Sequence, residues 1–293
     1  MAKKEIVLGD YVISENSFPY MIAEIGINHN GDLQIAKKLI DAANACMWNC
    51  VKFQKREPDI AVPEAQKNVM RDTPWGRITY LEYKKKIEFG KQEYDYIDSY
   101  CKEKPIAWTA SPWDIPSLEF LLNYDLPFIK IASASNTDFD MLKIACESKK
   151  TLLVSTGMST MAEMDEVVEF LEKYSDGNYI LMHTNSAYPS PAEELNLRMI
   201  TTMKERYDCL VGYSGHEIDL EPSVVATSLG AKVIERHVTL DHNMWGTDHA
   251  ASLSVAAMAM LQGRMRDVLV MLGNGEKVIT DKEKEVRKKL RGN

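Results

Sequence analysis

Short apolar runs alternate with helix-forming stretches along nearly the whole chain, and this alternation limits the fold more than any other feature. Each run is almost continuous in apolar side chains, which is typical of parallel strands covered on both faces. The eight runs are residues 20–28, 49–54, 106–111, 128–133, 151–157, 179–184, 209–216 and 232–239. Stretches with the apolar spacing of helices follow most of them, the last being 254–272.

Eight strand–helix units predict a closed parallel barrel of the α/β class, the (β/α)8 TIM barrel. Fewer than eight units would leave an open doubly wound sheet, which is the structural alternative. The 293 residues suit one barrel, which typically needs about 250 residues. We therefore expect a single catalytic domain over 1–293, with a short N-terminal β-hairpin in 1–18 and a charged C-terminal tail in 275–293.

Charge and hydropathy exclude several classes of partner. The net charge is −8 without a dense basic patch, so nucleic acid is not expected as a ligand. No apolar run approaches the roughly 18 residues of a membrane span, and the start of the chain lacks the apolar segment of a signal peptide. The five cysteines are scattered, as expected of small buried side chains in a reducing cytosol. We expect a cytoplasmic protein.

The segment 55–90 is longer than the connection between a strand and a helix requires. Long loops in compact domains are usually functional, and we expect this one to act as a lid.

Nearly every expected strand carries a polar residue near its C-terminal end. In a barrel these ends meet at one face, where active sites are built. The residues are Glu24, Asn28, Lys52, Gln54, Ser111, Lys130, Ser133, Ser155, Thr156, His183, Thr184, Ser214, His216, Glu235 and His237. We expect them to line a single pocket.

The side chains of this set indicate which ligands the pocket binds. Lys52 and Lys130, together with several hydroxyls, suit a phosphate or a carboxylate. His216 and His237 lie at the ends of neighbouring strands, so both imidazoles can reach one metal ion in an open, catalytic type of site. Glu24 can act on a proton or on a substrate hydroxyl. The set therefore favours a small polyanion, a divalent metal and a polar second substrate.

Seven motifs occur in a fixed order: "AEIGINHNGD", "VKFQ", "KIAS", "STGMS", "YPSP", "GYSGH" and "ERHVTLD…WGTDH". Together they resemble the N-acetylneuraminate (sialic acid) synthase family over about residues 20–255. This family condenses phosphoenolpyruvate with an aldehyde sugar. The resemblance implies a metal-dependent transferase that forms a 3-deoxy-2-ketoacid sugar and phosphate by C–O cleavage, and it implies a homo-oligomer.

The resemblance also assigns roles to residues. The metal ligands are His216 and His237, and the ion is manganese, with magnesium or cobalt as alternatives. The catalytic residues are Glu24, Lys52, Lys130, His216 and His237. The substrate-binding residues are Gln54, Ser133, Ser155, Tyr188, Ser214 and Asp248, to which the strand-end position adds Ser111. His242 is expected in a solvated loop, and His249 is not assigned a direct role.

Two departures from the family pattern concern the sugar. Relatives usually place a glycine and an acidic residue after the lysine motif, where this chain has Ala134 and Ser135. From the length that follows the barrel motifs, we also expect no antifreeze-like domain of the kind that many members carry after the barrel. We therefore expect an aldehyde sugar other than plain N-acetylmannosamine, either one whose polar groups suit the shorter hydroxyl of Ser135 or one whose contacts come from segment 55–90. A lid over the sugar would come from such loops, from another chain, or be absent.

Two other functions remain open at the level of sequence. A metal-free aldolase on the same barrel would use Lys130 as a Schiff-base nucleophile. A non-catalytic barrel that only binds an anionic sugar is the second alternative.

Overall fold

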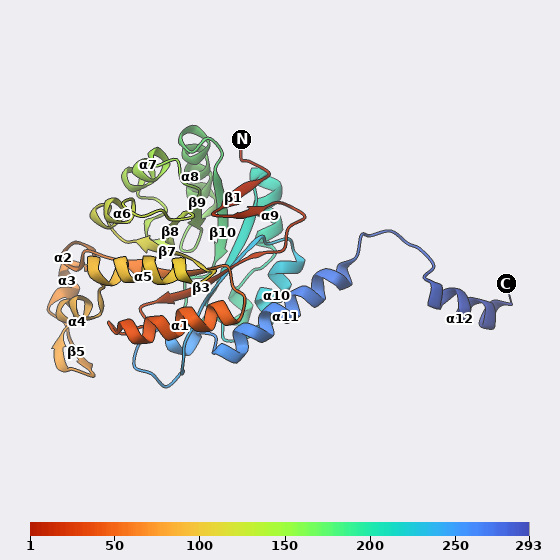
Figure 1. The fold of residues 1–293 in the computed structure, drawn as a ribbon. Helices are drawn as coiled ribbons and strands as arrows, with labels where there is room; N and C mark the ends of the chain where they lie inside the picture. Colours follow the sequence, from red (N-terminus) through yellow and green to blue (C-terminus); the bar gives the residue numbers. More distant parts are fainter. Residues whose placement is uncertain (293) are drawn as a thin grey trace.

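An eight-stranded parallel sheet forms the centre of the computed structural model, which describes residues 1–292. Its strands are β3 (Tyr20–Gly26), β4 (Cys50–Lys55), β7 (Ala107–Pro112), β8 (Ile129–Ile131), β9 (Leu152–Ser155), β10 (Tyr179–Thr184), β11 (Val211–Gly215) and β12 (Val233–His237). They follow the order β7-β4-β3-β12-β11-β10-β9-β8. Within this sheet β3 comes first in the sequence and β12 comes last, and these two strands pair with each other. The predicted (β/α)8 barrel is confirmed, and the open doubly wound alternative is wrong (Figure 1).

The barrel is nearly closed, and its one seam lies between β7 and β8. Within residues 1–292 no backbone ladder joins these two strands. A side chain spans the seam instead, because Thr109 Oγ1 donates a hydrogen bond of 2.9 Å to the carbonyl of Phe128. The strands thus surround one interior, with a weaker join on one side.

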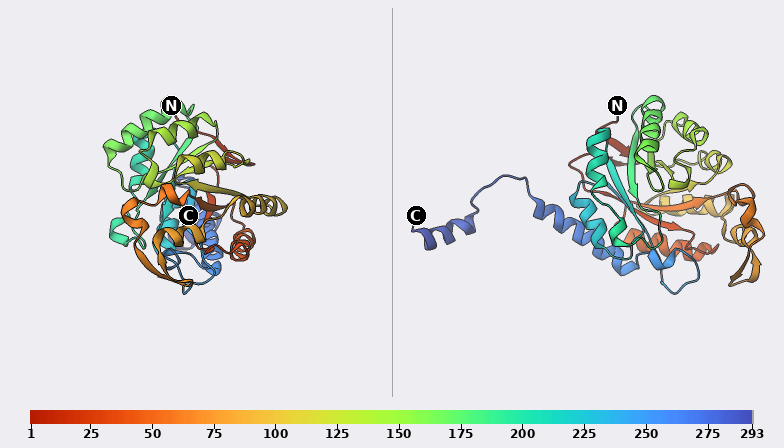
Figure 2. Two further views of the ribbon diagram at one scale, coloured as in Figure 1. Left: turned by 90° about the vertical axis from the view of Figure 1, so that its left-hand side faces the viewer. Right: turned by 180° about the vertical axis from the view of Figure 1, so that it is seen from behind.

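Helices cover the outside of the sheet (Figures 1 and 2). They are α1 (Leu33–Ala45), α5 (Lys91–Glu103), α6 (Ile115–Leu121), α7 (Phe139–Glu147), α8 (Met161–Tyr174), α9 (Met199–Tyr207), α10 (Glu221–Ser228) and α11 (Val255–Leu272). In α1 the side chain of Asp32 caps the first turn, and the buried residues Ala36, Leu39, Ile40 and Ala43 form one apolar stripe. Such stripes pack against the outer face of the strands and build the main core.

The N-terminal hairpin closes the bottom of the barrel. Strands β1 (Ile6–Leu8) and β2 (Tyr11–Ile13) pair antiparallel, and Gly9 makes the turn at φ +59°. Ile6, Leu8 and Ile13 are buried in a second core cluster together with residues from the barrel interior such as Phe128. The expected hairpin is therefore present, and it acts as an apolar plug.

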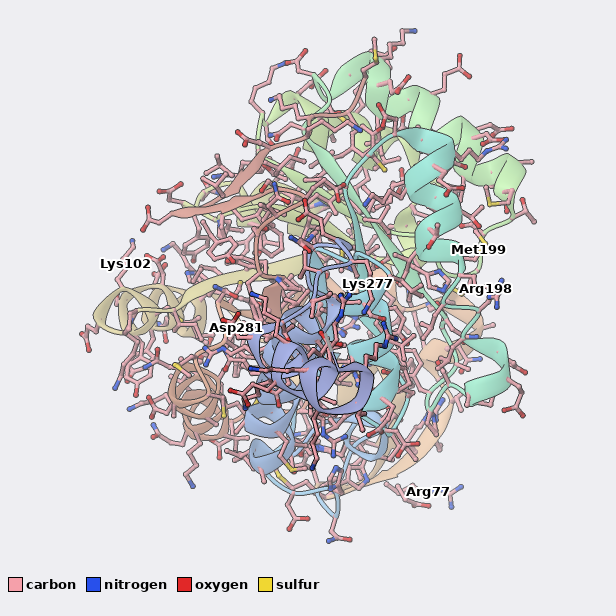
Figure 3. All side chains as sticks on the ribbon, turned by 90° about the vertical axis from the view of Figure 1, so that its right-hand side faces the viewer. Arg77, Lys102, Arg198, Met199, Lys277 and Asp281 are labelled. Carbon is pink, nitrogen blue, oxygen red and sulfur yellow. The ribbon has the colours of Figure 1, made fainter. Side chains whose placement is uncertain are left out.

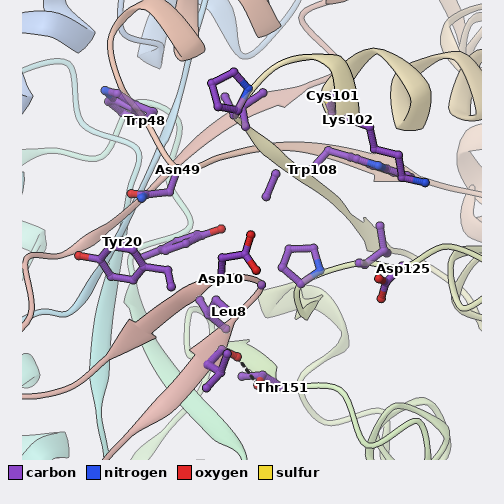
Figure 4. A pocket seen from close by; sticks show the side chains of 18 of the residues that line it. Leu8, Asp10, Tyr20, Trp48, Asn49, Cys101, Lys102, Trp108, Asp125 and Thr151 are labelled. Atoms are coloured by element: carbon purple, nitrogen blue, oxygen red, sulfur yellow. Dashed lines mark hydrogen bonds between the residues drawn. The ribbon is translucent and has the colours of Figure 1, made fainter.

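A broad hollow of about 1130 Å³ lies beside this plug, at the N-terminal ends of β3, β4 and β7 (Figure 4). All four lysines around it are paired with carboxylates: Lys102 with Asp98, Lys104 with Asp41, Lys149 with Asp176 and Lys150 with Asp125. A hollow whose cations are already neutralised, at the bottom face of a barrel, does not indicate a catalytic site.

Segment 55–90 is not the irregular loop that the sequence suggests. It folds into α2 (Pro58–Ala61), α3 (Glu64–Lys67), the hairpin β5 (Met70–Thr73) and β6 (Gly76–Thr79), and α4 (Tyr80–Ile87). Tyr83 and Ile87 of α4 are buried against Ile27, and Trp245 packs on the same cluster. The segment therefore forms a small structured cover at the mouth of the barrel, which we call the lid.

The C-terminal tail leaves the body of the barrel. Residues 271–292 are exposed, and the last part forms the charged helix α12 (Asp281–Arg291), which begins with a capping box of Thr280 and Glu283. Figures 1 and 2 show α12 standing apart from the other elements, and Figure 3 views the molecule from that end, with Lys277 and Asp281 labelled. Within residues 1–292, no helix is both long and apolar enough to cross a membrane.

Candidate active site

The C-terminal ends of the strands enclose a pocket of about 240 Å³. Its wall contains all but one of the residues that the sequence proposes for the site. These are Glu24, Lys52, Gln54, Ser111, Lys130, Ser133, Ser155, Tyr188, Ser214, His216 and His237. The exception is Asp248, which lies just behind His237. The strand ends thus bring together residues that are up to 213 positions apart, from Glu24 to His237.

Lys52 of β4 is buried in a network of hydrogen bonds and ion pairs. Its Nζ lies 2.7 Å from Glu24 Oε2 and donates to Ser111 Oγ at 2.9 Å. Glu24 pairs with Lys52 across β3 and β4 in the strand register, which sets this contact. On its other oxygen Glu24 accepts a hydrogen bond of 3.0 Å from Gln54 Nε2. These contacts hold a cation and a carboxylate at the floor of the pocket.

Lys130 of β8 faces the same floor from the other side of the seam. Its Nζ donates to Ser155 Oγ at 2.6 Å. Both lysines lie 3.6 Å from one oxygen of Glu235, and Glu235 accepts a third contact from Ser214 Oγ at 3.0 Å. Glu235 is therefore the shared counter-ion of the two ammonium groups.

Burial and charge act in opposite directions on these groups. Burial raises the pKa of Glu235, but Lys130 and Lys52 outweigh it and hold that pKa at about 2, so Glu235 stays ionised. Burial lowers the pKa of Lys130, and the neighbouring Lys52 lowers it further. For Lys52 burial again lowers the pKa, but Glu235 and Glu24 prevail and raise it. Lys52 is accordingly the more firmly charged of the two lysines.

The two predicted metal ligands lie side by side, with ring centroids 5.5 Å apart. His216 Nδ1 lies 2.6 Å from the backbone oxygen of Asn185 and therefore carries the proton, which leaves the lone pair on Nε2. That Nε2 accepts from the hydroxyl of Tyr188 at 2.9 Å. Burial, aided by His237, lowers the pKa of His216 to about 3, so its ring is neutral.

This donor set fits an open metal site. His237 Nδ1 is buried without a hydrogen-bond partner, and His216 presents a lone pair whose tautomer a backbone carbonyl fixes, as is usual for metal-binding histidines. Among residues 1–292, no group of three or more His, Cys, Asp or Glu side chains could enclose a metal ion. Two imidazoles would leave the remaining positions to water and substrate.

Asp248 and the remaining histidines lie behind this pair. Asp248 Oδ2 is 4.0 Å from His237 Nδ1. His242 is exposed, as the sequence predicts, and its ring contacts the carbonyl of Ser252. His249 is buried outside the pocket, where Nδ1 lies 2.8 Å from Thr239 Oγ1. It therefore belongs to the packing of the loop.

Three strand-end residues do not reach the pocket, contrary to the prediction. Asn28 bonds to the carbonyl of Val238, Thr156 to that of Met182, and His183 to that of Leu195. A strand turns alternate side chains to opposite faces, so some polar residues near a strand end face the helices or loops.

Some residues of the pocket were missed by the sequence reasoning or left out of the proposed site. Trp113, Ala132, Met158 and Ser186 have no signal in the strand-end pattern, whereas Thr184 and Glu235 are predicted at the pocket by that pattern, as found, but are given no role. Glu235 lies two residues before His237 on β12 and so shares its face, which agrees with its expected place in the pocket. Ala134 lines the pocket but Ser135 does not, so the hydroxyl of Ser135 is not a direct wall of the site.

Gly26 is needed where the site residues converge. It adopts φ +55° at an irregularity in the β3–β4 register. A Cβ there would lie 3.1 Å from Glu24 Oε1, 3.2 Å from Gln54 Nε2 and 3.3 Å from His237 Cε1. A glycine is favoured at this position by both conformation and space.

Known proteins share this barrel and these motifs. The NeuB family profile matches residues 39–277. The chain is 38% identical over 256 residues to N-acetylneuraminate-9-phosphate synthase of Drosophila melanogaster, which covers 86% of this chain and 68% of that protein. It is 34% identical over 278 residues to N,N'-diacetyllegionaminic acid synthase of Campylobacter jejuni, at 92% and 83% coverage.

A solved structure agrees over the whole length. The N-acetylneuraminic acid (sialic acid) synthetase of Leptospira borgpetersenii serovar Hardjo-bovis, in complex with citrate, superposes with a TM-score of 0.87 at 30% identity. The match covers 100% of this chain and 99% of that one. The profile match, the relatives above and this structural agreement together show that the chain belongs to the NeuB family of sialic acid synthase-like enzymes.

Proposed function

We propose that the chain condenses phosphoenolpyruvate with an aldehyde sugar to give a nonulosonic acid and phosphate. The observation that carries the proposal is the pair of lysines, Lys52 and Lys130, which lie in one small pocket with five serines and with the histidines His216 and His237. Relatives named as synthases of N-acetylneuraminate 9-phosphate and of diacetyllegionaminic acid support the same class of product.

Lys52 and Lys130 bind the anion in this proposal. An ammonium group has three donors. Lys130 uses one on Ser155 and lies 3.6 Å from Glu235, which leaves donors for a phosphate or carboxylate oxygen. The charge of phosphoenolpyruvate persists through the reaction, so these contacts mainly position the enol carbon against the aldehyde.

The reaction joins the methylene carbon of phosphoenolpyruvate to the aldehyde carbon of the sugar. Water adds to the enolic carbon, and the tetrahedral intermediate loses phosphate by C–O cleavage. In this proposal Glu24 takes a proton from that water or holds a sugar hydroxyl, a role supported by its fixed position between Lys52 and Gln54. A divalent metal, most simply manganese, would be held by His216 and His237 and would supply Lewis-acid polarisation of the aldehyde.

Phosphate release from phosphoenolpyruvate tests the proposal. The protein is incubated with a panel of aldehyde sugars, with and without a chelator. Phosphoenolpyruvate that carries ¹⁸O in the bridging position should yield labelled phosphate, because C–O cleavage leaves that oxygen on phosphorus. No release with any sugar, with manganese present, would refute the enzymatic proposal and favour a binding-only barrel.

The oligomeric state is a separate expectation. We propose a homo-oligomer, and light scattering after size exclusion measures it directly.

A further inference from the structure

A buried ion pair lies on the outer side of the barrel wall, between the strands and α10. Arg236 of β12 is 0% exposed, and Glu217, in the loop after β11, is 3% exposed. Arg236 Nη1 lies 2.8 Å from Glu217 Oε1. Both residues lie outside the active-site pocket, so the proposed function gives this pair no part.

The sequence places the ion pair directly beside both predicted metal ligands. Arg236 precedes His237, and Glu217 follows His216. The strand register pairs Gly215 with Arg236, so the two histidines stand one residue further along neighbouring strands. Side chains alternate between the two faces of a strand, so the histidines face the pocket while Arg236 faces the helices. The ion pair therefore joins the two chain segments that carry the imidazoles.

Arg236 also holds the backbone of the loop that runs from β11 to α10. Its Nη1 donates to the carbonyl of Asp219 at 3.0 Å, and its Nη2 donates to the carbonyl of Glu217. Nη1 also lies 3.0 Å from the hydroxyl of Ser223 in α10. A guanidinium group can make these contacts together because its N–H donors lie in one rigid plane.

The carboxylate of Glu217 is fixed as well. Tyr213 of β11 donates its hydroxyl to Glu217 Oε2 at 2.7 Å, so both oxygens of the carboxylate are engaged. The carboxylate folds back over the end of β11, where a Cβ on Gly215 would lie 2.5 Å from Oε2 and 2.7 Å from Oε1. A glycine at this position leaves room for the arrangement.

Other contacts orient His216 but do not tie it to β12. Its Nδ1 lies 2.6 Å from the backbone oxygen of Asn185, and its own backbone oxygen accepts from the amide of Ser190 at 3.1 Å. Both partners belong to the loop after β10. The ladder between β11 and β12 ends at Gly215 and Arg236, so beyond this point the ion pair continues the connection between the two segments.

Stability alone does not account for such a pair. Taking two charges out of water is unfavourable, and an apolar pair of similar volume is often as stable. Arg236 Nε adds to the cost, because it is buried without a hydrogen-bond partner. An ion pair with this many hydrogen bonds does supply a fixed geometry, which an apolar contact does not.

We propose that Arg236 and Glu217 are positioning residues for the metal centre, which set the distance between His216 and His237. The inference rests on the proposed function, since the metal belongs to it. A site with only two protein ligands depends on their spacing, because metal–nitrogen distances tolerate deviations of only about 0.2 Å.

Manganese binding in the absence of substrates tests the inference, with free Mn²⁺ measured by electron paramagnetic resonance. The main variant, Arg236→Met/Glu217→Gln, removes both charges but keeps an acceptor for Tyr213. Its dissociation constant for manganese should rise by about 10- to 100-fold, the usual effect of changing a residue that orients metal ligands. Its metal-free urea midpoint should stay close to that of wild type, because no unpaired charge is left buried.

Arg264→Gln/Glu221→Gln is the matched control. This exposed pair joins α11 to the start of α10, and the change removes the same two charges. The control should bind manganese like wild type, and a loss equal to that of the main variant would overturn the inference. A lower urea midpoint with wild-type manganese affinity in the main variant would show that the buried pair serves stability alone, and would overturn it too.

Arg236→Lys is a milder second variant, because it keeps the charge but loses the planar set of donors. Its manganese affinity should lie between those of wild type and the main variant. If the main variant does not fold, Arg236→Lys decides: weaker manganese binding by this folded variant supports the inference, and wild-type affinity overturns it.

Metal binding separates this inference from the proposed function. If wild type binds manganese and the main variant binds it weakly, the inference stands even where no sugar supports phosphate release. Equal affinities of the two folded proteins would overturn the inference and leave the proposed reaction untouched. A wild-type protein that binds no manganese would overturn the metal site and this inference together.

Discussion

Lys130 decides between the two chemistries that the barrel can support. Its pKa is lowered by burial and by Lys52, which is a property of Schiff-base lysines as well as of anion-binding ones. Its Nζ, however, donates a hydrogen bond to Ser155 and lies beside Glu235, whose charge acts against this lowering and favours the ammonium form.

We expect Lys130→Met to weaken phosphoenolpyruvate binding by roughly 1.5–3 kcal/mol, the range of a charge-assisted hydrogen bond. Titration calorimetry measures this. Borohydride treatment of the wild-type protein with substrates should leave its mass unchanged. A reduced adduct on Lys130 or Lys52 would instead establish the Schiff-base aldolase.

Lys84 gives the folding free energy a defined pH dependence. Burial in the lid lowers the pKa of Lys84 to about 8, and Arg56 and Arg71 lower it further, whereas Asp248 and Glu88 raise it. Between pH 8 and the ordinary lysine value of 10.5, the unfolded chain binds a proton on Lys84 that the native protein has lost. Stability from this residue therefore rises with pH over that window, and its unfavourable contribution is fully present below pH 8.

The difference in unfolding free energy between wild type and Lys84→Met should accordingly increase by about 2 kcal/mol from about pH 7.5 to about pH 9.5. Urea denaturation at the two pH values measures it. The comparison with the variant cancels the contributions of other groups. A constant or falling difference would show that Lys84 is not held in a low-pKa environment.

At the scale of elements, the N-terminal hairpin contributes to stability rather than to chemistry. Ile13 is fully buried in the cluster that plugs the barrel, at the end opposite the active site. We expect Ile13→Ala to cost about 2–5 kcal/mol of unfolding free energy, the usual range for deleting a buried aliphatic side chain. The folded fraction should keep wild-type kcat, which active-site titration alongside thermal melts would check. A lower kcat in fully folded protein would contradict this assignment.

The elements differ in how well the sequence predicts them. The barrel strands could be predicted because parallel strands buried on both faces appear as continuous apolar runs. The lid could not, since β5 and β6 are short and largely exposed and have no such run. Its turn at Thr73 and Gly76, and the Thr79–Glu82 capping box of α4, are local signals that do not reveal where the piece packs.

The residues of the site also divide into those that the sequence predicts and those that it does not. Residues at the C-terminal ends of strands could be gathered from the barrel geometry alone, and the motifs gave most of them roles. Trp113 and Ser186 follow the strands in loops, so only the folded structure shows that they reach the pocket. Lys84 carries no motif, and its lowered pKa depends on burial, which a sequence does not display.

At the scale of the whole molecule, the barrel and the C-terminal tail are energetically separate. Every residue from 274 to 292 is exposed, and α12 buries no residue. We therefore expect a chain that ends at Gly273 to melt within about 2 °C of the full chain, since a surface change is usually worth less than 0.5 kcal/mol. Differential scanning calorimetry at several protein concentrations checks this. A large, concentration-dependent drop would show that the tail acts between copies of the chain.

Along the described residues, 1–292, the seam between β7 and β8 is the one place around the barrel where neighbouring strands are not joined by backbone hydrogen bonds. Ser111 and Lys52 stand on one side of it and Lys130 and Ser155 on the other, while Glu235 faces both lysines. An anion bound to both lysines would connect the two sides of the seam, where no backbone hydrogen bonds connect them. Hydrogen exchange should accordingly be fastest among the barrel strands at β7 and β8, and phosphoenolpyruvate should slow it there more than at β11. The bound substrate would then supply the connection between β7 and β8 that the barrel itself lacks.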